Sequence, residues 1–100
     1  MTDTQILLYY MIMKIMLNYN CVFDEYKNSI NDGDVYKYMI FKLDAYKHRH
    51  VCVFCDNIFI STEYTNATRK TNANITRKMK TIYMSDPEFL EKLTESLTEI

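Results

Sequence analysis

The 100-residue sequence has few of the residues that end or reverse regular structure: one glycine (Gly33), one proline (Pro87) and no tryptophan. Sheets of short strands depend on glycine, proline or Asn-Gly pairs at their turns. Their scarcity argues against such a sheet and favours helices joined by polar linkers. At this length one domain with a modest core is expected. We therefore predict a mostly α fold, a small helical domain of about four to five helices.

The sequence also lacks an excess of charge of either sign. Charged residues make up 25% of the chain, and the formal net charge at pH 7 is −1. A protein that binds nucleic acid or an anionic membrane through its overall charge carries a clear positive excess. Composition therefore supports neither kind of partner.

No apolar run is long enough to span a membrane. The segment ILLYYMIMKIML at residues 6–17 is interrupted by Lys14, and a spanning helix needs about 20 apolar residues. A secretory signal would place basic residues ahead of the run, where this chain has only Asp3. The run therefore predicts a buried helix over residues 5–18, and we expect no membrane association.

The densest group of chemically active residues is HRHVCVFC at residues 48–55. Tetrahedral zinc needs four converging nitrogen or sulfur ligands. On a helix, His48, Cys52 and Cys55 would share one face and form a candidate metal site, with His50 pointing elsewhere. On a strand, neighbouring same-face residues stand about 7 Å apart, too far for one ion. The alternative, which we favour, makes both cysteines small buried core residues and requires no cofactor.

Catalytic residues are not recognisable in the pattern. Bulky apolar residues surround Cys52 and Cys55, whereas a cysteine nucleophile needs a neighbouring base and partial exposure. An odd number of cysteines without a secretory signal is typical of reduced thiols in the cytosol. One glycine cannot build a phosphate-binding loop. We therefore predict a non-enzymatic protein with no catalytic or cofactor-binding residues.

Further helices are predicted along the chain. Residues 35–47 have apolar side chains at helical spacing: Val35, Met39, Leu43 and Tyr46. Strand alternation fits part of the same segment. Residues 62–82 are polar and rich in Thr and Asn, which predicts an intrinsically weak helix.

The C-terminal segment SDPEFLEKLTESLTEI has the clearest helical pattern. Ser85 and Glu88 have the spacing of a capping box, and Pro87 suits a first helical turn. One apolar stripe follows, formed by Phe89, Leu93, Leu97 and Ile100. This stripe predicts an amphipathic helix packed on a core.

A basic strip precedes that segment, where TRK occurs at residues 68–70 and again at 76–78. Its members, next to Tyr64, are Arg69, Lys70, Arg77, Lys78 and Lys80. Such a strip can contact the phosphates of nucleic acid. We favour a solvated helix face balanced by the acidic C-terminal segment. A nucleic-acid-binding protein and a small zinc-stabilised regulator stay open as alternative functions.

The second half of the chain resembles the BACK segment of poxvirus BTB–kelch proteins. The shared pattern is a cysteine-bearing apolar helix, a helix with a tyrosine near its start, a DPEF turn and a final leucine stripe. The matching residues are Cys52, Phe54, Ile58, Tyr64, Ala67, Ile75, residues 85–89, Leu97 and Ile100. Leu93 departs from the pattern by one position, with Leu90 an adjacent candidate.

The resemblance implies a BACK-like helical segment at residues 51–100, truncated at its C-terminus. It implies an N-terminal helical segment at residues 1–50, the end of a degenerate BTB region. The structural core would be Cys52, Phe54, Ile58, Phe89, Leu93, Leu97 and Ile100. One glycine and no tryptophan exclude a kelch blade.

As to function, the resemblance implies a viral protein–protein interaction module related to ubiquitin-ligase adaptors, either host-modulating or a decayed remnant. Its expected partners are proteins, including a host cullin ubiquitin ligase component, in the host cell cytoplasm. Exposed Leu97 and Ile100 at the helix end would favour self-association.

Overall fold

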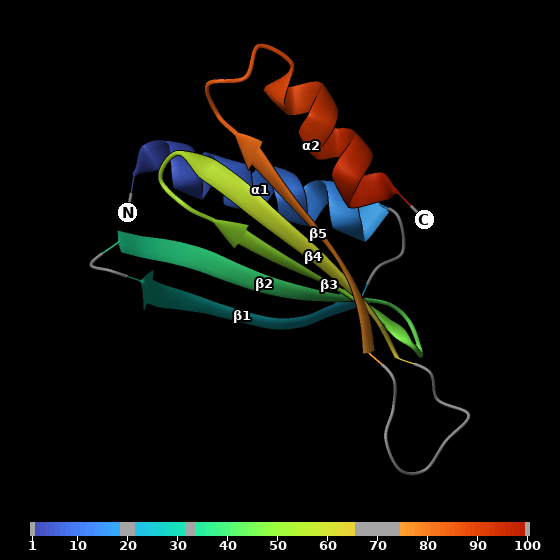
Figure 1. Cartoon of the computed structure of the whole chain (residues 1–100). Helices are drawn as coiled ribbons and strands as arrows, with labels where there is room; N and C mark the ends of the chain where they lie inside the picture. Colours follow the sequence, from blue (N-terminus) through green and yellow to red (C-terminus); the bar gives the residue numbers. More distant parts are fainter. Residues whose placement is uncertain (1, 19–21, 32–33, 66–74, 100) are drawn as a thin grey trace.

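The computed structural model describes residues 2–18, 22–31, 34–65 and 75–99. Its elements in chain order are α1 (Asp3–Asn18), β1 (Val22–Asn31), β2 (Asp34–Asp44), β3 (Lys47–Val53), β4 (Asn57–Thr65), β5 (Ile75–Tyr83) and α2 (Phe89–Thr98). The strands form one antiparallel sheet in the order β1-β2-β3-β4-β5, and both helices pack on the same face (Figure 1). The prediction of a mostly α fold is wrong: this is a small two-layer domain of helices and sheet.

The strands were missed because helical spacing does not exclude a strand. Val35, Met39 and Leu43 are four residues apart, and an even separation also places side chains on one face of a strand. In β2 these residues do face the helices, with Met39 fully buried and the other two half-buried. The polar segment 62–82, predicted as a helix, instead contributes to β4 and β5 on either side of residues 66–74.

The apolar segment that begins at Cys52, which the BACK resemblance predicts to be a helix, also forms strands. The apolar residues that begin at Cys52 belong to β3 and β4, joined by a short turn. The expected division between residues 50 and 51 falls inside β3, which hydrogen-bonds to β2 on one side and β4 on the other. A single sheet therefore runs across that position.

Two of the sheet's turns are made without glycine. The turn after β2 is closed by the Asp44 carboxylate, which accepts a hydrogen bond of 2.7 Å from the Tyr46 amide. In the turn after β3, the Phe54 amide donates to the Asn57 carbonyl at 2.9 Å. Asp side chains can substitute for glycine in this way because they imitate a backbone acceptor. The scarcity of glycine and proline therefore does not prevent this chain from forming a sheet.

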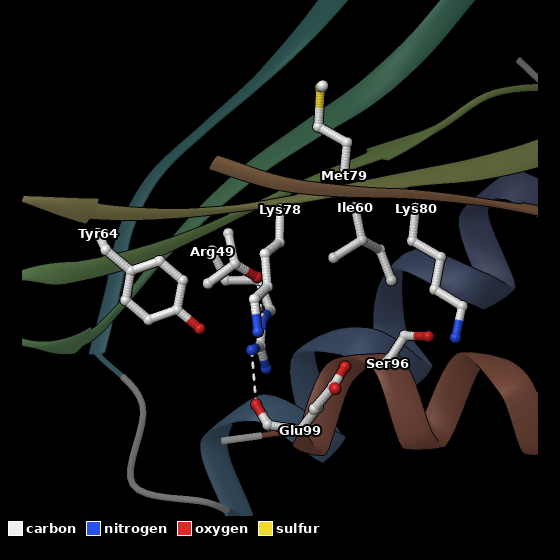
Figure 2. A pocket seen from close by; sticks show the side chains of 9 residues that line it. Arg49, Ile60, Tyr64, Lys78, Met79, Lys80, Ser96 and Glu99 are labelled. Carbon is white, nitrogen blue, oxygen red and sulfur yellow. Dashed lines mark hydrogen bonds between the residues drawn. The ribbon is translucent and has the colours of Figure 1, made fainter. Parts of the chain in front are cut away.

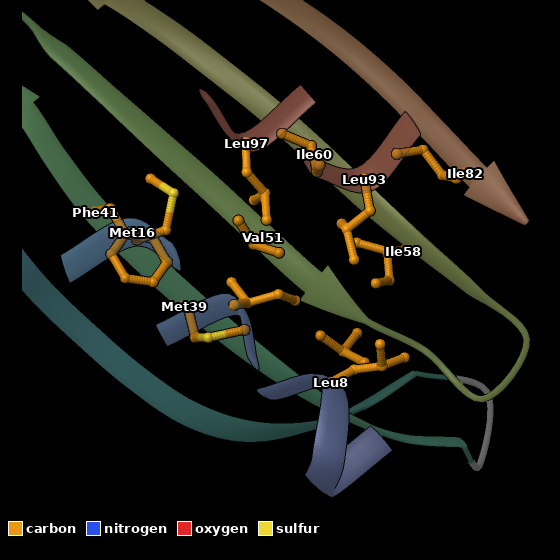
Figure 3. Close-up of a cluster of buried hydrophobic side chains, with 12 residues drawn as sticks. Leu8, Met16, Met39, Phe41, Val51, Ile58, Ile60, Ile82, Leu93 and Leu97 are labelled. Atoms are coloured by element: carbon orange, nitrogen blue, oxygen red, sulfur yellow. The ribbon is translucent and has the colours of Figure 1, made fainter. Parts of the chain in front are cut away.

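The hydrophobic core lies between the helices and the sheet (Figure 3). Side chains from both helices and from β2 to β5 form it: Leu8, Ile12, Met16, Met39, Phe41, Val51, Val53, Ile58, Ile60, Ile82, Leu93 and Leu97. Met39, Val51 and Ile60 are neighbours across three strands, which keeps them on one face. Strand alternation thus supplies a continuous apolar floor for α1 and α2.

The predicted helix near the N-terminus is confirmed as α1, and it begins with a capping box formed by Thr2 and Gln5. The Thr2 hydroxyl accepts from the Gln5 amide at 3.1 Å, and the Gln5 side-chain oxygen accepts from the Thr2 amide at 2.7 Å. Gln5 also donates to the carbonyls of Val35 at 2.9 Å and Val53 at 3.1 Å. This one buried side chain therefore starts the helix and fastens it to β2 and β3.

Helix α2 begins at Phe89, and the predicted capping box of Ser85 and Glu88 does not form. The carboxylate of Asp86 accepts instead from the Glu88 amide at 2.9 Å and from the Lys92 ammonium group at 2.5 Å. Asp86 precedes the helix, so its negative charge lies near the positive end of the helix dipole. Within the described residues, neither helix has the length and apolar character needed to cross a bilayer.

Candidate functional site

The candidate metal ligands, which we did not favour as a site, do not converge. His48 and Cys52 lie at alternate positions of β3 on its far face, which we define as the sheet face opposite the helices. Cys55 is exposed in the turn that follows, whereas Cys52 is buried. Because the segment is a strand, adjacent same-face side chains are about 7 Å apart, which separates His48 from Cys52 by about 13 Å. Across the described ranges, no three His, Cys, Asp or Glu side chains are placed to hold a metal ion.

His50 belongs instead to a polar network across four strands of the far face. Its Nδ1 lies 2.5 Å from the Tyr38 hydroxyl, and its Nε2 lies 3.4 Å from a Glu63 carboxylate oxygen. The other Glu63 oxygen accepts from Arg77 Nε at 3.2 Å. An imidazole proton on Nε2 would face Glu63, and Nδ1 would then accept from the tyrosine. The Tyr38 hydroxyl, the His50 imidazole and the Glu63 carboxylate therefore contact one another. Together with Arg77, they connect the four strands from β2 to β5.

The predicted basic strip is divided between the two faces of the sheet. Arg77 lies on the far face against Glu63, while Lys78 and Lys80 line a groove beside α2. Arg69 and Lys70 lie outside the described residues. The division follows from strand geometry, in which successive side chains point to opposite faces. These cations therefore do not form one continuous surface.

Lys78 and Lys80 border a groove of 410 Å³ between α2 and the helix-facing side of β4 and β5 (Figure 2). Among the residues that line it are Arg49, Thr62, Tyr64, Lys78, Lys80, Ser96 and Glu99. Met79 contributes at the rim, but its side chain points to the far face of β5 in Figure 2. The groove brings β3, β4, β5 and α2 to one place.

Arg49 forms the floor of the groove and is only 3% exposed. Its guanidinium group donates to the Thr62 hydroxyl at 3.1 Å and to the main-chain carbonyls of Leu97 and Glu99, the latter at 2.6 Å. The last carbonyls of a helix have no partners within the helix and carry partial negative charge. Arg49 supplies both the hydrogen bonds and a positive charge to these carbonyls. The end of α2 therefore compensates for the cost of burying the guanidinium group.

A second surface lies on the side of α1 that faces away from the sheet. Leu7 is 70% exposed, Tyr10 64% and Leu17 51%. The helix buries only its other side, through Gln5, Leu8, Ile12 and Met16. The prediction of a buried helix is therefore wrong for this side of α1. Large apolar side chains grouped on one exposed helix face are typical of a contact surface.

The predicted core residues have mixed positions. Ile58, Leu93 and Leu97 lie in the core, and Phe89 packs against its edge. The expectation that Leu97 is exposed and favours self-association is therefore wrong, because Leu97 is buried. Cys52 is buried on the far face, and the Phe54 ring packs at 4.6 Å on that of Tyr36. Ile100 lies outside the described residues.

Neither Arg49 nor the exposed face of α1 was identified from the sequence. Arg49 does alternate with Val51 and Val53, the signal of a strand position facing the core, but its partners on α2 are about fifty residues away. Comparisons with protein-family models, curated proteins and solved structures find no match to this chain. We therefore infer the function of the chain from the geometry of these surfaces.

Proposed function

We propose that the protein is a non-enzymatic protein–protein interaction module that pairs with a second copy of itself through α1. The observation that carries the proposal is a stripe of exposed residues, which we call the outer α1 stripe: Asp3, Leu7, Tyr10, Lys14 and Leu17. Their separations alternate between four and three residues. This is the spacing of the side chains that meet along the seam of two packed helices.

Four residues of the stripe are complementary to their copies in the antiparallel orientation, and Leu17 lies beyond these pairs. A two-fold axis between Leu7 and Tyr10 places Leu7 opposite Tyr10 of the second copy, and Asp3 opposite Lys14 of the second copy. Each contact then occurs twice, as in any isologous interface. A parallel arrangement would place each charge beside its own copy, so electrostatic repulsion disfavours it.

The length of α1 limits how tightly two copies of the chain can bind each other. A helix of 16 residues is about 24 Å long. One helix pair of this length buries less than the standard interface of about 1,600 Å². We therefore expect a reversible dimer with a dissociation constant in the micromolar range rather than an obligate one.

Sedimentation equilibrium over a range of protein concentrations tests the proposal. Asp3→Lys or Lys14→Asp alone should weaken the dimer, because each places like charges opposite one another. The double variant with both substitutions should restore it. Lys42→Asp, at an exposed position of β2, is the matched control and should leave the dimer unchanged. A wild-type chain that stays monomeric at the highest concentration would overturn the proposal, as would a double variant no better than either single one.

The polar contacts within the domain are compatible with a binding role, because they join strands to one another or to α2. His50 and Glu63 contact each other and their strand neighbours, and Arg49 is bonded to the end of α2. The relationship to BTB–BACK–kelch proteins, the cullin partner and the host cytoplasm stay predictions from the sequence. The self-association proposed here does not depend on them.

A further inference from the structure

We infer that the groove between α2 and strands β4 and β5 binds a phosphate-bearing ligand. Lys78 and Lys80 alternate along β5, so both point to the helix side, and their ammonium groups border the groove from one edge (Figure 2). Both side chains are exposed, and no ion pair within the described residues engages either of them. Lysines placed in this way bind phosphate as point charges.

Ser96 provides the second, independent observation. It is 4% exposed, and its hydroxyl has no hydrogen-bond partner among the described residues. The neighbouring hydroxyls of α2 behave differently: Thr94 donates to the Leu90 carbonyl at 2.9 Å, and Thr98 donates to the Thr94 carbonyl at 2.7 Å. A buried hydroxyl without a partner is unfavourable. Because Ser96 lines the groove opposite β5, a ligand oxygen there would accept its hydrogen bond.

Three other residues of the groove would affect how a phosphate binds beside Lys78, Lys80 and Ser96. Arg49 is bonded to the carbonyls of α2 and adds positive potential from below rather than a primary contact. Tyr64 closes one end of the groove in Figure 2. Glu99 contributes a carboxylate to the lining, and its negative charge opposes the binding of an anion. Removing that charge should therefore strengthen binding.

The dimensions of the groove indicate a small ligand rather than a polymer. Its volume of 410 Å³ falls in the range of small-molecule sites, about 300–1,000 Å³. The net charge of −1 provides no long-range attraction for a polyanion such as nucleic acid. Phosphate is the shared chemistry of two remaining sources, a soluble phosphate compound and a phosphorylated lipid headgroup.

The test is a titration of the full chain with inorganic phosphate, at ionic strength held constant with chloride, followed by amide chemical shifts. We expect saturable shifts confined to the groove, near Lys78, Lys80 and Ser96. Lys78→Gln and Lys80→Gln should each weaken binding about tenfold, the effect of one charge-assisted hydrogen bond. Lys42→Gln is the matched control, because it removes one exposed lysine from the far face.

Two further variants separate a binding role from a structural one. Ser96→Ala should weaken phosphate binding several-fold while leaving the melting temperature unchanged or higher, since alanine favours the helix and removes an unsatisfied hydroxyl. Glu99→Gln should tighten binding several-fold. Shifts spread over the whole surface, or a titration that neither lysine variant alters, would overturn the inference.

A flotation assay with phosphatidylcholine vesicles containing phosphatidic acid distinguishes the two sources. Vesicle binding that is lost in Lys78→Gln and Lys80→Gln assigns the groove to a lipid headgroup. Phosphate binding without vesicle binding assigns it to a soluble phosphate compound, and the absence of both contradicts the site. The groove and the outer α1 stripe share no residue, so either proposal can fail without the other.

Discussion

Arg49 on β3 donates a hydrogen bond to the main-chain carbonyl of Leu97 near the end of α2, and a second reaches Glu99. The pairing joins a strand in the middle of the sheet to the last helix of the chain. It also explains why an arginine is tolerated in the interior. The partial negative charge at the helix C-terminus stands in for a carboxylate.

Removal of this connection should destabilise the fold. Arg49→Met keeps much of the side-chain bulk but leaves the Thr62 hydroxyl and the α2 carbonyls without their donor. We expect a loss of about 3 kcal/mol in the free energy of unfolding, measured by urea denaturation. Arg49→Lys should give an intermediate loss, because one ammonium group cannot reproduce the fork of donors.

Arg77→Met is the control for Arg49, since the Arg77 side chain is 57% exposed in its ion pair with Glu63. Exposed pairs contribute about 0–1 kcal/mol. If both methionine variants had equally small effects, Arg49 would not hold α2 in place.

The hydrogen bonds of Gln5 should also be measurable as stability. Gln5→Ala removes the capping box with Thr2 and the two bonds to the carbonyls of β2 and β3. We expect a loss of about 2 kcal/mol on urea denaturation. Thr4→Ala, one residue earlier on the exposed side of α1, should change stability by no more than about 0.5 kcal/mol. Equal effects at the two positions would contradict the role assigned to Gln5.

Phe41 is the largest fully buried side chain of the core. Phe41→Ala should cost about 3–5 kcal/mol, through lost burial and the cavity left behind. Thermal and urea unfolding followed by circular dichroism would measure the change. Leu90→Ala is a suitable comparison because Leu90 is 59% exposed, and it should have an effect of no more than about 0.5 kcal/mol. A small effect at Phe41 would show that the helices do not pack on β2 as described.

The titration of Asp86 should report its contact with Lys92. The hydrogen bond from Lys92, with help from the Glu88 amide, holds the pKa of Asp86 below its ordinary value of 3.8, and the same contact raises the pKa of Lys92 above 10.5. A carboxylate with a lowered folded-state pKa contributes stability above its ordinary pKa and loses it as pH falls through the lowered value. The stabilisation should therefore disappear only below pH 3.8.

Carbon-detected NMR of the Asp86 carboxyl group measures that midpoint directly. Lys92→Met should move the midpoint upward, while the Glu88 amide continues to hold it partly down. Because the pair is at the surface, added salt should reduce the shift. An Asp86 midpoint unaffected by Lys92→Met would show that the ion pair does not persist in solution.

Local signals in the sequence predicted the two helices. The apolar run that contains Leu8 and Ile12, and the stripe of Leu93 and Leu97, are both in helices whose inward faces form the core. These predictions succeeded because a helix is built from contacts within about four residues. The residues at which the helices begin were harder to predict. The Ser85–Glu88 pattern does not form a capping box at α2, whereas Thr2 and Gln5 do form one at α1.

The sheet and the groove could not be read from the same kind of signal. Val35, Met39 and Leu43 satisfy helical and strand spacing alike, and pairing with β3 decides between the two. The basic residues near position 78 were expected on one helix face, but the strand sends Arg77 and Lys78 to opposite sides. Because these residues form a strand and not a helix, Lys78 and Lys80 share one face of the sheet and Arg77 lies on the other.

The sequence by itself determined where helices form at the two ends and which apolar residues are available for a core. The tertiary structure alone decided that the middle of the chain is a sheet, and that Arg49, Lys78 and Ser96 surround one groove. The physical reason is distance along the chain. Helical hydrogen bonds join near neighbours, whereas strand pairing and the contact of Arg49 with α2 depend on segments that meet only when the whole domain folds.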